Sequence, residues 1–251
     1  MTFSNPLLEA WRVGRPTLGL WCMTPNPALA EYAATIDVDW ILWDLQHGQI
    51  TDADLGPLFR ACLGRPVAPL ARVAANDLTL IGRALDVGAI GVIVPLVNTA
   101  REAAAAAEAC RYPPYGVRSF GPNRVGLTVG TYDPSELNKV ACIVMVETAD
   151  GLANVEAIAA TAGVDAILIG PSDLALSLGL QPADRPEAHA AAVRRIIAAC
   201  QAHGKAAGIV LGDGATARTH LELGFTFVSI ATDVGLVLEV LARELKVARG
   251  G

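Results

Sequence analysis

Eight short apolar segments recur along the 251-residue chain, and helix-like stretches rich in alanine and leucine separate them. The segments lack strict apolar–polar alternation and are Thr17–Trp21, Asp39–Asp44, Ala68–Val73, Gly91–Pro95, Cys142–Glu147, Ala166–Gly170, Ala206–Val210 and Phe227–Ile230. Continuous apolar runs of this kind are typical of parallel strands buried on both faces. Eight strand–helix alternations in about 250 residues predict an α/β fold, a (β/α)8 TIM barrel, with residues 1–251 forming one domain.

An open, doubly wound sheet is the alternative architecture. It predicts a glycine-rich dinucleotide-binding turn after the first strand, and no such turn follows Trp21. The longer stretches between the segments predict helices over Asp77–Val87, Thr99–Arg111, Pro186–His203 and Gly214–Leu223.

Composition excludes several functional classes. A chain that is 53% apolar and 18% charged is not intrinsically disordered. The net charge of −6 and the lack of a Lys/Arg cluster argue against nucleic-acid binding. The longest apolar run, Gly88–Val97, is far short of the ~20 residues that span a bilayer, and residues 1–15 lack a signal-peptide core. Five scattered cysteines indicate free thiols in a reducing compartment. We therefore expect a cytoplasmic protein that binds neither nucleic acid nor membrane.

In a TIM barrel, functional groups gather at the carboxyl ends of the strands. The chain has only three lysines, Lys139, Lys205 and Lys246, and none follows a predicted strand. A Schiff-base mechanism needs a lysine in the site, so the sequence disfavours it.

Two carboxylates do stand at neighbouring strand ends. Glu147 ends the fifth predicted strand and Asp173 follows the sixth. Adjacent strands lie about 4.8 Å apart, so the two side chains would converge and repel. A divalent cation would relieve that repulsion, and oxygen ligands suit Mg²⁺ or Mn²⁺. The alternative is that Asp173 caps the helix that begins there.

One histidine and one arginine also occupy strand ends. His47 alone among the histidines follows a strand and suits a general base. The other three, His189, His203 and His220, lie in predicted helices and are expected at the surface. Arg72 ends the third strand, where it is either a core salt bridge or an oxyanion clamp, and the nearby metal site favours the clamp.

Four motifs in register give the chain a family resemblance. They are Arg111-Tyr-Pro-Pro-Tyr-Gly-Val-Arg118, Ile169-Gly-Pro-Ser-Asp-Leu174, Asp44-Leu-Gln-His47 and Val146-Glu147. The chain resembles the metal-dependent (class II) pyruvate aldolases of the HpcH/HpaI family over nearly its whole length. The first motif opens a long connection, Tyr112–Asn138, which we expect to form an active-site wall or a subunit contact.

The resemblance implies a binding site for a 2-oxo acid. Glu147 and Asp173 would ligate the divalent metal, Mg²⁺, Mn²⁺ or Co²⁺. Backbone N–H groups of Ser172 and Asp173 would hold the substrate carboxylate at the start of a helix. The metal and Arg72 would stabilise the enolate oxygen.

The resemblance also assigns the general base and its surroundings. His47 would be the base, with its basicity raised by Asp86. Met145 occupies the position of a substrate-binding glutamine, and Gln46 that of a glutamate beside the histidine.

The implied reaction is cleavage or formation of 4-hydroxy-2-oxo acids, with pyruvate or a related 2-oxo acid such as hydroxypyruvate as one product and an aldehyde as the other. A citryl- or malyl-CoA lyase is the nearest alternative, but three lysines and a pI near 5.2 offer little for its phosphates. A non-catalytic barrel that binds a metal or an oxo acid is the second alternative.

The last predicted helix, Asp233–Val247, carries an apolar stripe. The simpler interpretation is that this helix closes its own barrel. The resemblance instead implies that neighbouring subunits exchange it, in a homo-oligomer that is a trimer or a hexamer.

Overall fold

Eight parallel strands form a closed barrel in chain order, with β8 pairing back onto β1. The computed structural model describes residues 3–122, 124–180 and 187–250. The strands are β1 (Thr17–Cys22), β2 (Trp40–Asp44), β3 (Ala68–Arg72), β4 (Gly91–Val94), β5 (Ala141–Val146), β6 (Ala166–Ile169), β7 (Ala206–Ile209) and β8 (Phe227–Thr232). The predicted (β/α)8 barrel is confirmed, and the open sheet is wrong.

Each predicted strand is present, with ends that differ by no more than two residues from the prediction. The largest difference is at β8, which continues past Ile230 to Thr232. It does so because Ala231 and Thr232 pair with Leu20 and Trp21 of β1, after a register shift at Gly19.

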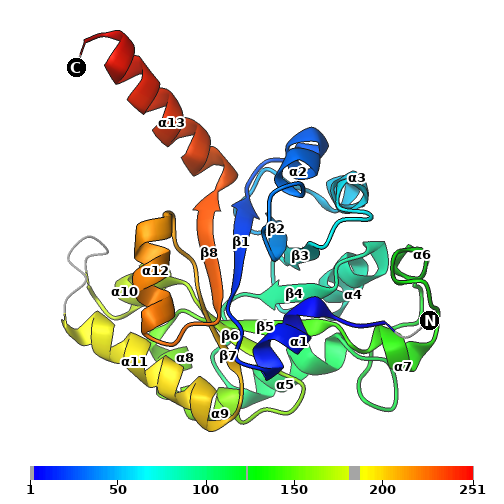
Figure 1. Ribbon diagram of the computed structural model, residues 1–251. Helices are drawn as coiled ribbons and strands as arrows, with labels where there is room; N and C mark the ends of the chain where they lie inside the picture. Colours follow the sequence, from blue (N-terminus) through cyan, green and yellow to red (C-terminus); the bar gives the residue numbers. More distant parts are fainter. Residues whose placement is uncertain (1–2, 123, 181–186, 251) are drawn as a thin grey trace.

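The helices lie mainly around the outside of the barrel, except α13, which projects from it (Figure 1). They are α1 (Pro6–Arg12), α2 (Pro27–Ala33), α3 (Asp52–Ala61), α4 (Leu78–Val87), α5 (Ala100–Ala109), α6 (Val125–Val129), α7 (Pro134–Leu137), α8 (Ala149–Ala153), α9 (Val155–Ala159), α10 (Pro171–Ser177), α11 (Glu187–Ala202), α12 (Gly214–Glu222) and α13 (Asp233–Ala248). The four predicted inter-strand helices correspond to α4, α5, α11 and α12. Pro186, the predicted start of the third, lies outside the described residues.

Large side chains fill the amino-terminal half of the barrel interior. The rings of Trp40 and Phe227 pack at a tilt of 40° with centroids 4.6 Å apart, and Leu7 of α1 belongs to the same buried cluster. A Cβ at Gly19 would overlap the Trp40 ring, so the glycine makes room for it. The filled amino end leaves the carboxyl end as the open face of the barrel.

The connection Tyr112–Asn138 lies at the closed end. It contains α6 and α7, and it is tied to the amino-terminal segment by a hydrogen bond from Phe3 N to Glu136 Oε2 (2.6 Å). None of its described residues lines the pocket at the open face. Within one chain, this connection is therefore not an active-site wall.

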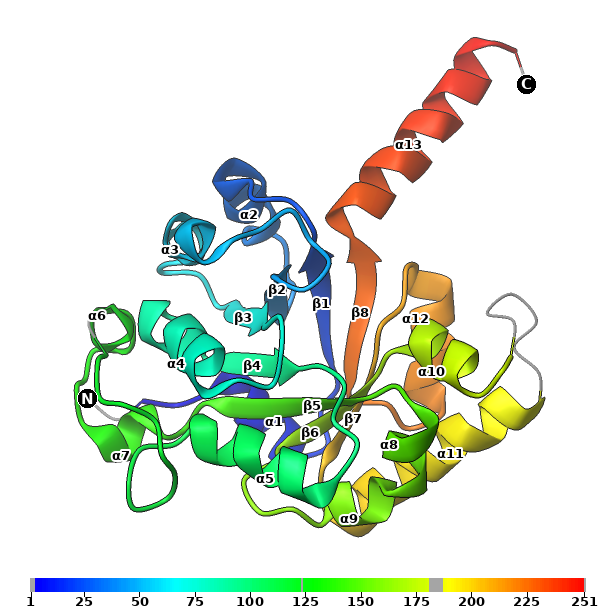
Figure 2. The same ribbon diagram turned by 180° about the vertical axis from the view of Figure 1, so that it is seen from behind.

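Helix α13 projects away from the barrel beyond the end of β8 (Figures 1 and 2). Asp233 is its one buried residue within the described chain. Its exposed apolar side chains are Val234, Leu236, Val237, Leu238, Val240, Leu241, Leu245 and Val247. The interpretation that this helix closes its own barrel is wrong, because among the described residues its apolar side chains remain exposed. No helix in the described part of the chain is long and apolar enough to cross a membrane.

Candidate active site

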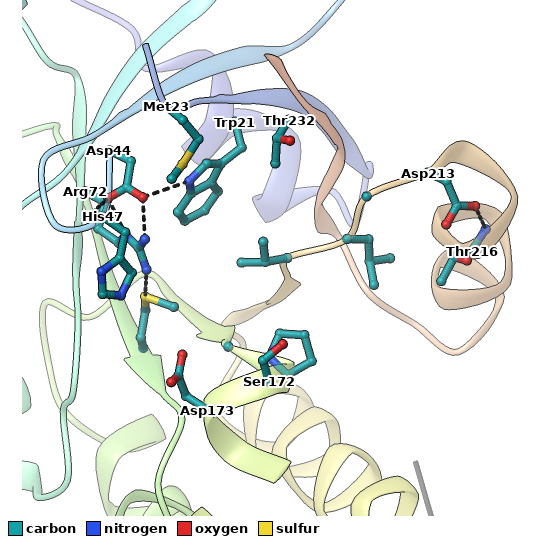
Figure 3. Close-up of a pocket in the computed structure, with 16 residues that line it drawn as sticks. Trp21, Met23, Asp44, His47, Arg72, Ser172, Asp173, Asp213, Thr216 and Thr232 are labelled. Atoms are coloured by element: carbon teal, nitrogen blue, oxygen red, sulfur yellow. Dashed lines mark hydrogen bonds and ion pairs between the residues drawn. The ribbon is translucent and has the colours of Figure 1, made fainter. Parts of the chain in front are cut away.

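A pocket of about 430 Å³ opens at the carboxyl end of the barrel. In Figure 3, Asp44, Arg72 and His47 lie on one side of the pocket, Ser172 and Asp173 lie below it, and Asp213 and Thr216 lie on the far side. The residues come from the ends of several strands and the loops that follow them. This placement is the one that the barrel rule predicts for functional groups.

The alternation of side chains along the strands explains why charged side chains face the barrel interior at the carboxyl ends of β2 and β3. Inward-facing positions alternate along each strand. On β2 the inward residues Trp40 and Leu42 are followed by Asp44, and on β3 Leu70 is followed by Arg72. The register sets Asp44 directly opposite Arg72. The apolar interior is thus capped by a charged layer.

Arg72 and Asp44 form a buried ion pair with two contacts. Arg72 Nε donates to Asp44 Oδ1 at 2.8 Å, and Nη2 donates to Oδ2. Trp21 Nε1 also donates to Oδ2 (3.2 Å), and the guanidinium lies 4.8 Å from the centre of the Trp21 ring. Burial raises the pKa of Asp44, but the contacts with Arg72 outweigh it and the pKa lies below its ordinary value. Arg72 therefore forms a core salt bridge and also lines the pocket.

Asp44 also shapes the loop that carries the histidine. Its Oδ1 accepts hydrogen bonds from the backbone N–H of Gln46 (3.0 Å) and of His47 (3.3 Å). This turn directs the exposed His47 side chain into the pocket. Gln46 Oε1 is buried without a hydrogen-bond partner.

Glu147 and Asp173 follow neighbouring strands, β5 and β6, whose ends pair through Val146 and Ile169. Glu147 is 3% exposed. Burial raises the pKa of its carboxyl group, and the negative charge of Asp173 raises it further. The two carboxylates therefore repel each other. A Cβ at Gly170 would overlap Glu147 Oε2, so this glycine leaves the space that the carboxylate occupies.

A strained backbone position holds Glu147 in place. Leu96, in the loop after β4, has φ of 55° and is the one non-glycine residue with positive φ in the described chain. Its N–H donates to Glu147 Oε1 at 2.9 Å. Leucine rarely adopts this conformation, which costs about 1–3 kcal/mol and often marks functional sites. No sequence motif predicts this contact, because a backbone N–H makes it.

Ser172 and Asp173 lie in the first turn of α10, are exposed and line the pocket. The N-cap of α10 is Gly170, so the interpretation of Asp173 as the cap is wrong. His189 of α11 lies beneath this turn, with Nε2 3.2 Å from the Pro171 carbonyl oxygen. His189 is 6% exposed, which corrects its expected place at the surface.

Met145 lies one inward-facing position below Glu147 on β5. It is buried and lines the pocket, and its Sδ lies 3.8 Å from Arg72 Nη1. Asp86 lies elsewhere, in the last turn of α4, where it accepts a hydrogen bond from Arg118 Nη2 (2.6 Å). The structure thus brings together every predicted site residue except Asp86, whose role with His47 stays a prediction.

The potential metal ligands are few. In the described part of the chain, no three His, Cys, Asp or Glu side chains are grouped so that they could hold a metal ion. A cation at Glu147 and Asp173 would need further oxygen ligands from water or substrate. None of the three lysines lines the pocket, in agreement with the argument against a Schiff base.

Sequence reasoning missed several pocket residues. Asp44 was noted only as part of a motif, although its position on the inward face of β2 beside Arg72 could have identified it. Four apolar residues that line the pocket were also missed: Trp21, Met23, Val210 and Leu211. Apolar residues that line a pocket belong to no sequence motif. In the sequence they cannot be distinguished from apolar residues of the core.

Comparisons with known proteins agree over the whole barrel. The family model for HpcH/HpaI aldolase/citrate lyase matches residues 17–239. A hydroxypyruvate/pyruvate aldolase of Rhizorhabdus wittichii is 38% identical over 244 residues, which cover 96% of this chain and 97% of the relative. A 5-keto-4-deoxy-D-glucarate aldolase of Klebsiella pneumoniae is 37% identical, with 93% of each chain covered.

A solved structure agrees as well. A crystal structure of a family protein from Burkholderia cenocepacia superposes with a TM-score of 0.92 at 33% identity and covers 98% of this chain and 100% of that one. Sequence, pocket and comparisons lead to one assignment: the chain belongs to the HpcH/HpaI aldolase/citrate lyase family.

Proposed function

We propose that the protein is a divalent-metal-dependent aldolase that forms and cleaves 4-hydroxy-2-oxo acids, with pyruvate or hydroxypyruvate as the 2-oxo acid. The observation that carries this proposal is the buried carboxylate of Glu147, which lies against Gly170 of the pocket and is repelled by Asp173, a residue that lines the pocket together with Arg72 and His47. Relatives with near-complete coverage are named as aldolases, which supports a lyase.

The residues present fit a divalent cation. Both donors are carboxylates, and hard cations such as Mg²⁺, Mn²⁺ and Co²⁺ accept oxygen ligands. The raised pKa of Glu147 reflects an unfavourable charge that a cation would stabilise. When bound, the cation would supply Lewis-acid stabilisation of negative charge on the substrate oxygens. Glu147 and Asp173 would hold it, and the backbone N–H groups of Ser172 and Asp173 would bind the substrate carboxylate.

The proton transfers belong to residues of this chain. His47 would take a proton from C3 of the 2-oxo acid, and the electron pair would move toward the C2 oxygen, giving the enolate. Arg72 would donate hydrogen bonds to that oxygen while Asp44 fixes its orientation. C3 then bonds to the carbonyl carbon of the aldehyde, and the proton passes to the new hydroxyl oxygen. Cleavage runs through the same steps in reverse.

A lyase that acts on coenzyme A thioesters has less support. The phosphates of the coenzyme need cationic partners. Arg72 is the one Lys or Arg among the described residues of the pocket, and it is paired with Asp44.

We further propose that the protein is a homo-oligomer in which α13 packs on another subunit, a trimer or hexamer as the family resemblance implies. An unpartnered apolar stripe of this length on a helix indicates an interaction surface. The five buried, free cysteines support action in the reducing cytoplasm.

An aldol-addition assay tests the proposed function. The metal-free protein is incubated with pyruvate or hydroxypyruvate and an aldehyde, with and without Mg²⁺, Mn²⁺ or Co²⁺. We expect a 4-hydroxy-2-oxo acid only when a divalent cation is present. Product formation at the full rate in excess chelator would contradict the metal dependence, and no product with any combination would contradict the aldolase.

A further inference from the structure

The first residue of α13 is buried, whereas the rest of the helix is exposed. Asp233 is 4% exposed, and its carboxylate contacts the segment that follows β1. Oδ1 accepts the backbone N–H of Met23 at 2.8 Å. Oδ2 accepts the backbone N–H of Thr24 at 3.1 Å and its hydroxyl group at 2.6 Å. One carboxylate therefore ties the end of β1 to the start of α13.

Helix capping alone does not explain this contact. The N-cap of α13 is Thr232, whose hydroxyl oxygen accepts the N–H of Gly235 at 2.9 Å. The Asp233 carboxylate also accepts the adjacent N–H of Val234 (2.8 Å), in addition to its contacts with the segment after β1. Burying a carboxylate costs hydration. Because another side chain already caps the helix, the contact with β1 points to a further role.

The segment that Asp233 holds leads to the loop that carries His47. The carbonyl oxygen of Met23 accepts the backbone N–H of Gln49 at 2.8 Å. A Cβ at Gly48 would come within 3.1 Å of the same oxygen, so the loop passes close to Met23 at this point. Hydrogen bonds therefore run from Asp233, through the backbone of Met23, to the residue two positions after His47.

His47 thus lies between two anchors of its loop. Asp44 accepts the N–H of His47 itself (3.3 Å), and Met23 accepts the N–H of Gln49. The His47 side chain is exposed and lines the pocket, so the backbone of the loop determines where its imidazole lies. The first anchor belongs to the buried ion pair of β2 and β3, whereas the second depends on Asp233.

We infer that Asp233 is a positioning residue for the proton transfer, because it holds the His47 loop in place through Met23 and Gln49. Asp233 itself does not line the pocket. The inference rests on the proposed aldolase function, in which His47 is the general base. It also connects that base to α13, the helix that we propose packs on another subunit.

Exchange of the methyl protons of pyruvate for deuterium tests this role, because it needs the base but no aldehyde. Asp233→Ala should lower kcat for exchange by about tenfold or more, since a small displacement of a reacting group is costly. Mn²⁺ affinity, measured by calorimetry, should stay within about twofold of wild type, because Glu147 and Asp173 follow other strands. Unchanged exchange in a folded Asp233→Ala protein would overturn the inference.

Hydrogen exchange of the backbone amides gives a readout that does not depend on activity. The Gln49 N–H should exchange about tenfold faster in Asp233→Ala than in wild type, because the Met23 carbonyl that accepts it is no longer fixed. Equal protection of this amide in the two proteins would contradict the path from Asp233 to the loop.

A double-mutant cycle separates positioning from a general loss of structure. If Asp233 acts through His47, adding Asp233→Ala to His47→Gln should change the remaining pyruvate exchange by less than about twofold. A comparable loss in both backgrounds would mean that Asp233 acts independently of the base and would overturn the inference. Should the alanine variant not fold, the same cycle is run with Asp233→Asn, which keeps the shape and one acceptor oxygen and should give a smaller loss.

Asp133→Ala is the matched control. Asp133 also stands at the start of a helix, where its carboxylate accepts the N–H of Ser135 (2.9 Å), but α7 lies at the closed end of the barrel. This variant should exchange pyruvate protons at the wild-type rate. An equal loss in Asp133→Ala and Asp233→Ala would overturn the inference.

The wild-type protein separates the two levels of the argument. Wild-type exchange, together with an equal rate in Asp233→Ala, would overturn this inference and leave the proposed function standing. Absence of wild-type exchange with every metal would overturn the proposed function, and this inference with it.

Discussion

Arg72 and Asp44 join the ends of two adjacent barrel strands through a buried, two-contact ion pair. The same carboxylate accepts the backbone N–H groups of Gln46 and His47. One side chain therefore orients both Arg72, which we propose stabilises the enolate oxygen, and the loop that carries His47, the proposed general base.

Replacing this carboxylate should destabilise the protein. Asp44→Asn keeps the shape but leaves the Arg72 guanidinium buried without its counter-charge, so we expect a loss of about 3–5 kcal/mol in the free energy of unfolding. Urea denaturation at pH 7 measures the loss. Glu222→Gln, which removes an ion pair with Arg218 between exposed side chains on α12, should cost no more than about 1 kcal/mol. Similar losses in the two variants would contradict the role given to Asp44.

The stability lost in Asp44→Asn should depend on pH, in a direction set by the pKa of Asp44. The folded-state pKa of Asp44 lies below its ordinary value, so its contribution to stability is present above the unfolded-state pKa and is lost as the pH falls through the folded-state pKa. The stability gap between wild type and Asp44→Asn should be constant near neutral pH and narrow below about pH 4. If the difference in free energy of unfolding became smaller between pH 5 and pH 8, it would contradict a lowered pKa for Asp44.

Gly170 should be essential for the geometry of Glu147. A methyl group in Gly170→Ala would overlap Glu147 Oε2 and displace the carboxylate, so we expect divalent-cation affinity to fall by about tenfold or more. Isothermal titration calorimetry with Mn²⁺ measures the change. Gly82→Ala is the control, because its added Cβ meets nothing within 4 Å inside α4 and alanine favours the helix. Wild-type affinity in Gly170→Ala would contradict the placement of the metal at Glu147.

The α13 stripe should hold the oligomer together. Leu241→Lys places a charge in the middle of the stripe and should shift the protein toward smaller assemblies, since burying an unpaired charge in an interface is costly. Light scattering after size exclusion gives the mass. Glu222→Lys adds the same side chain at an exposed position of α12 and should leave the mass unchanged. A wild-type protein that is monomeric would contradict the proposed assembly.

Much of the fold could be predicted because parallel strands buried on both faces leave a clear apolar pattern. The same pattern located Glu147, His47 and Arg72, since polar residues at the ends of apolar runs are conspicuous. The amphipathic pattern of α13 also identified the helix. It could not tell which surface the stripe packs on, because one chain's periodicity carries no information about its partner.

The rest of the site depends on contacts between distant segments. The backbone N–H of Leu96 donates to Glu147, and His189 lies close to the carbonyl oxygen of Pro171. Neither contact depends on a recognisable sequence motif. For Asp86 the family resemblance implies a contact that one chain does not make. Resemblance pairs Asp86 with His47, whereas within this chain Asp86 pairs with Arg118.

We propose that Glu147 and Asp173 hold a divalent cation while His47 removes a proton from the 2-oxo acid. Exchange of pyruvate methyl protons for deuterium, followed by proton NMR, measures this proton removal without an aldehyde. We predict rapid exchange in the wild type only with Mg²⁺, Mn²⁺ or Co²⁺, no metal-stimulated exchange in Glu147→Gln, and a loss of about 10²–10⁴-fold in His47→Gln. Exchange that persists in excess chelator, or at the wild-type rate in both variants, would contradict the account.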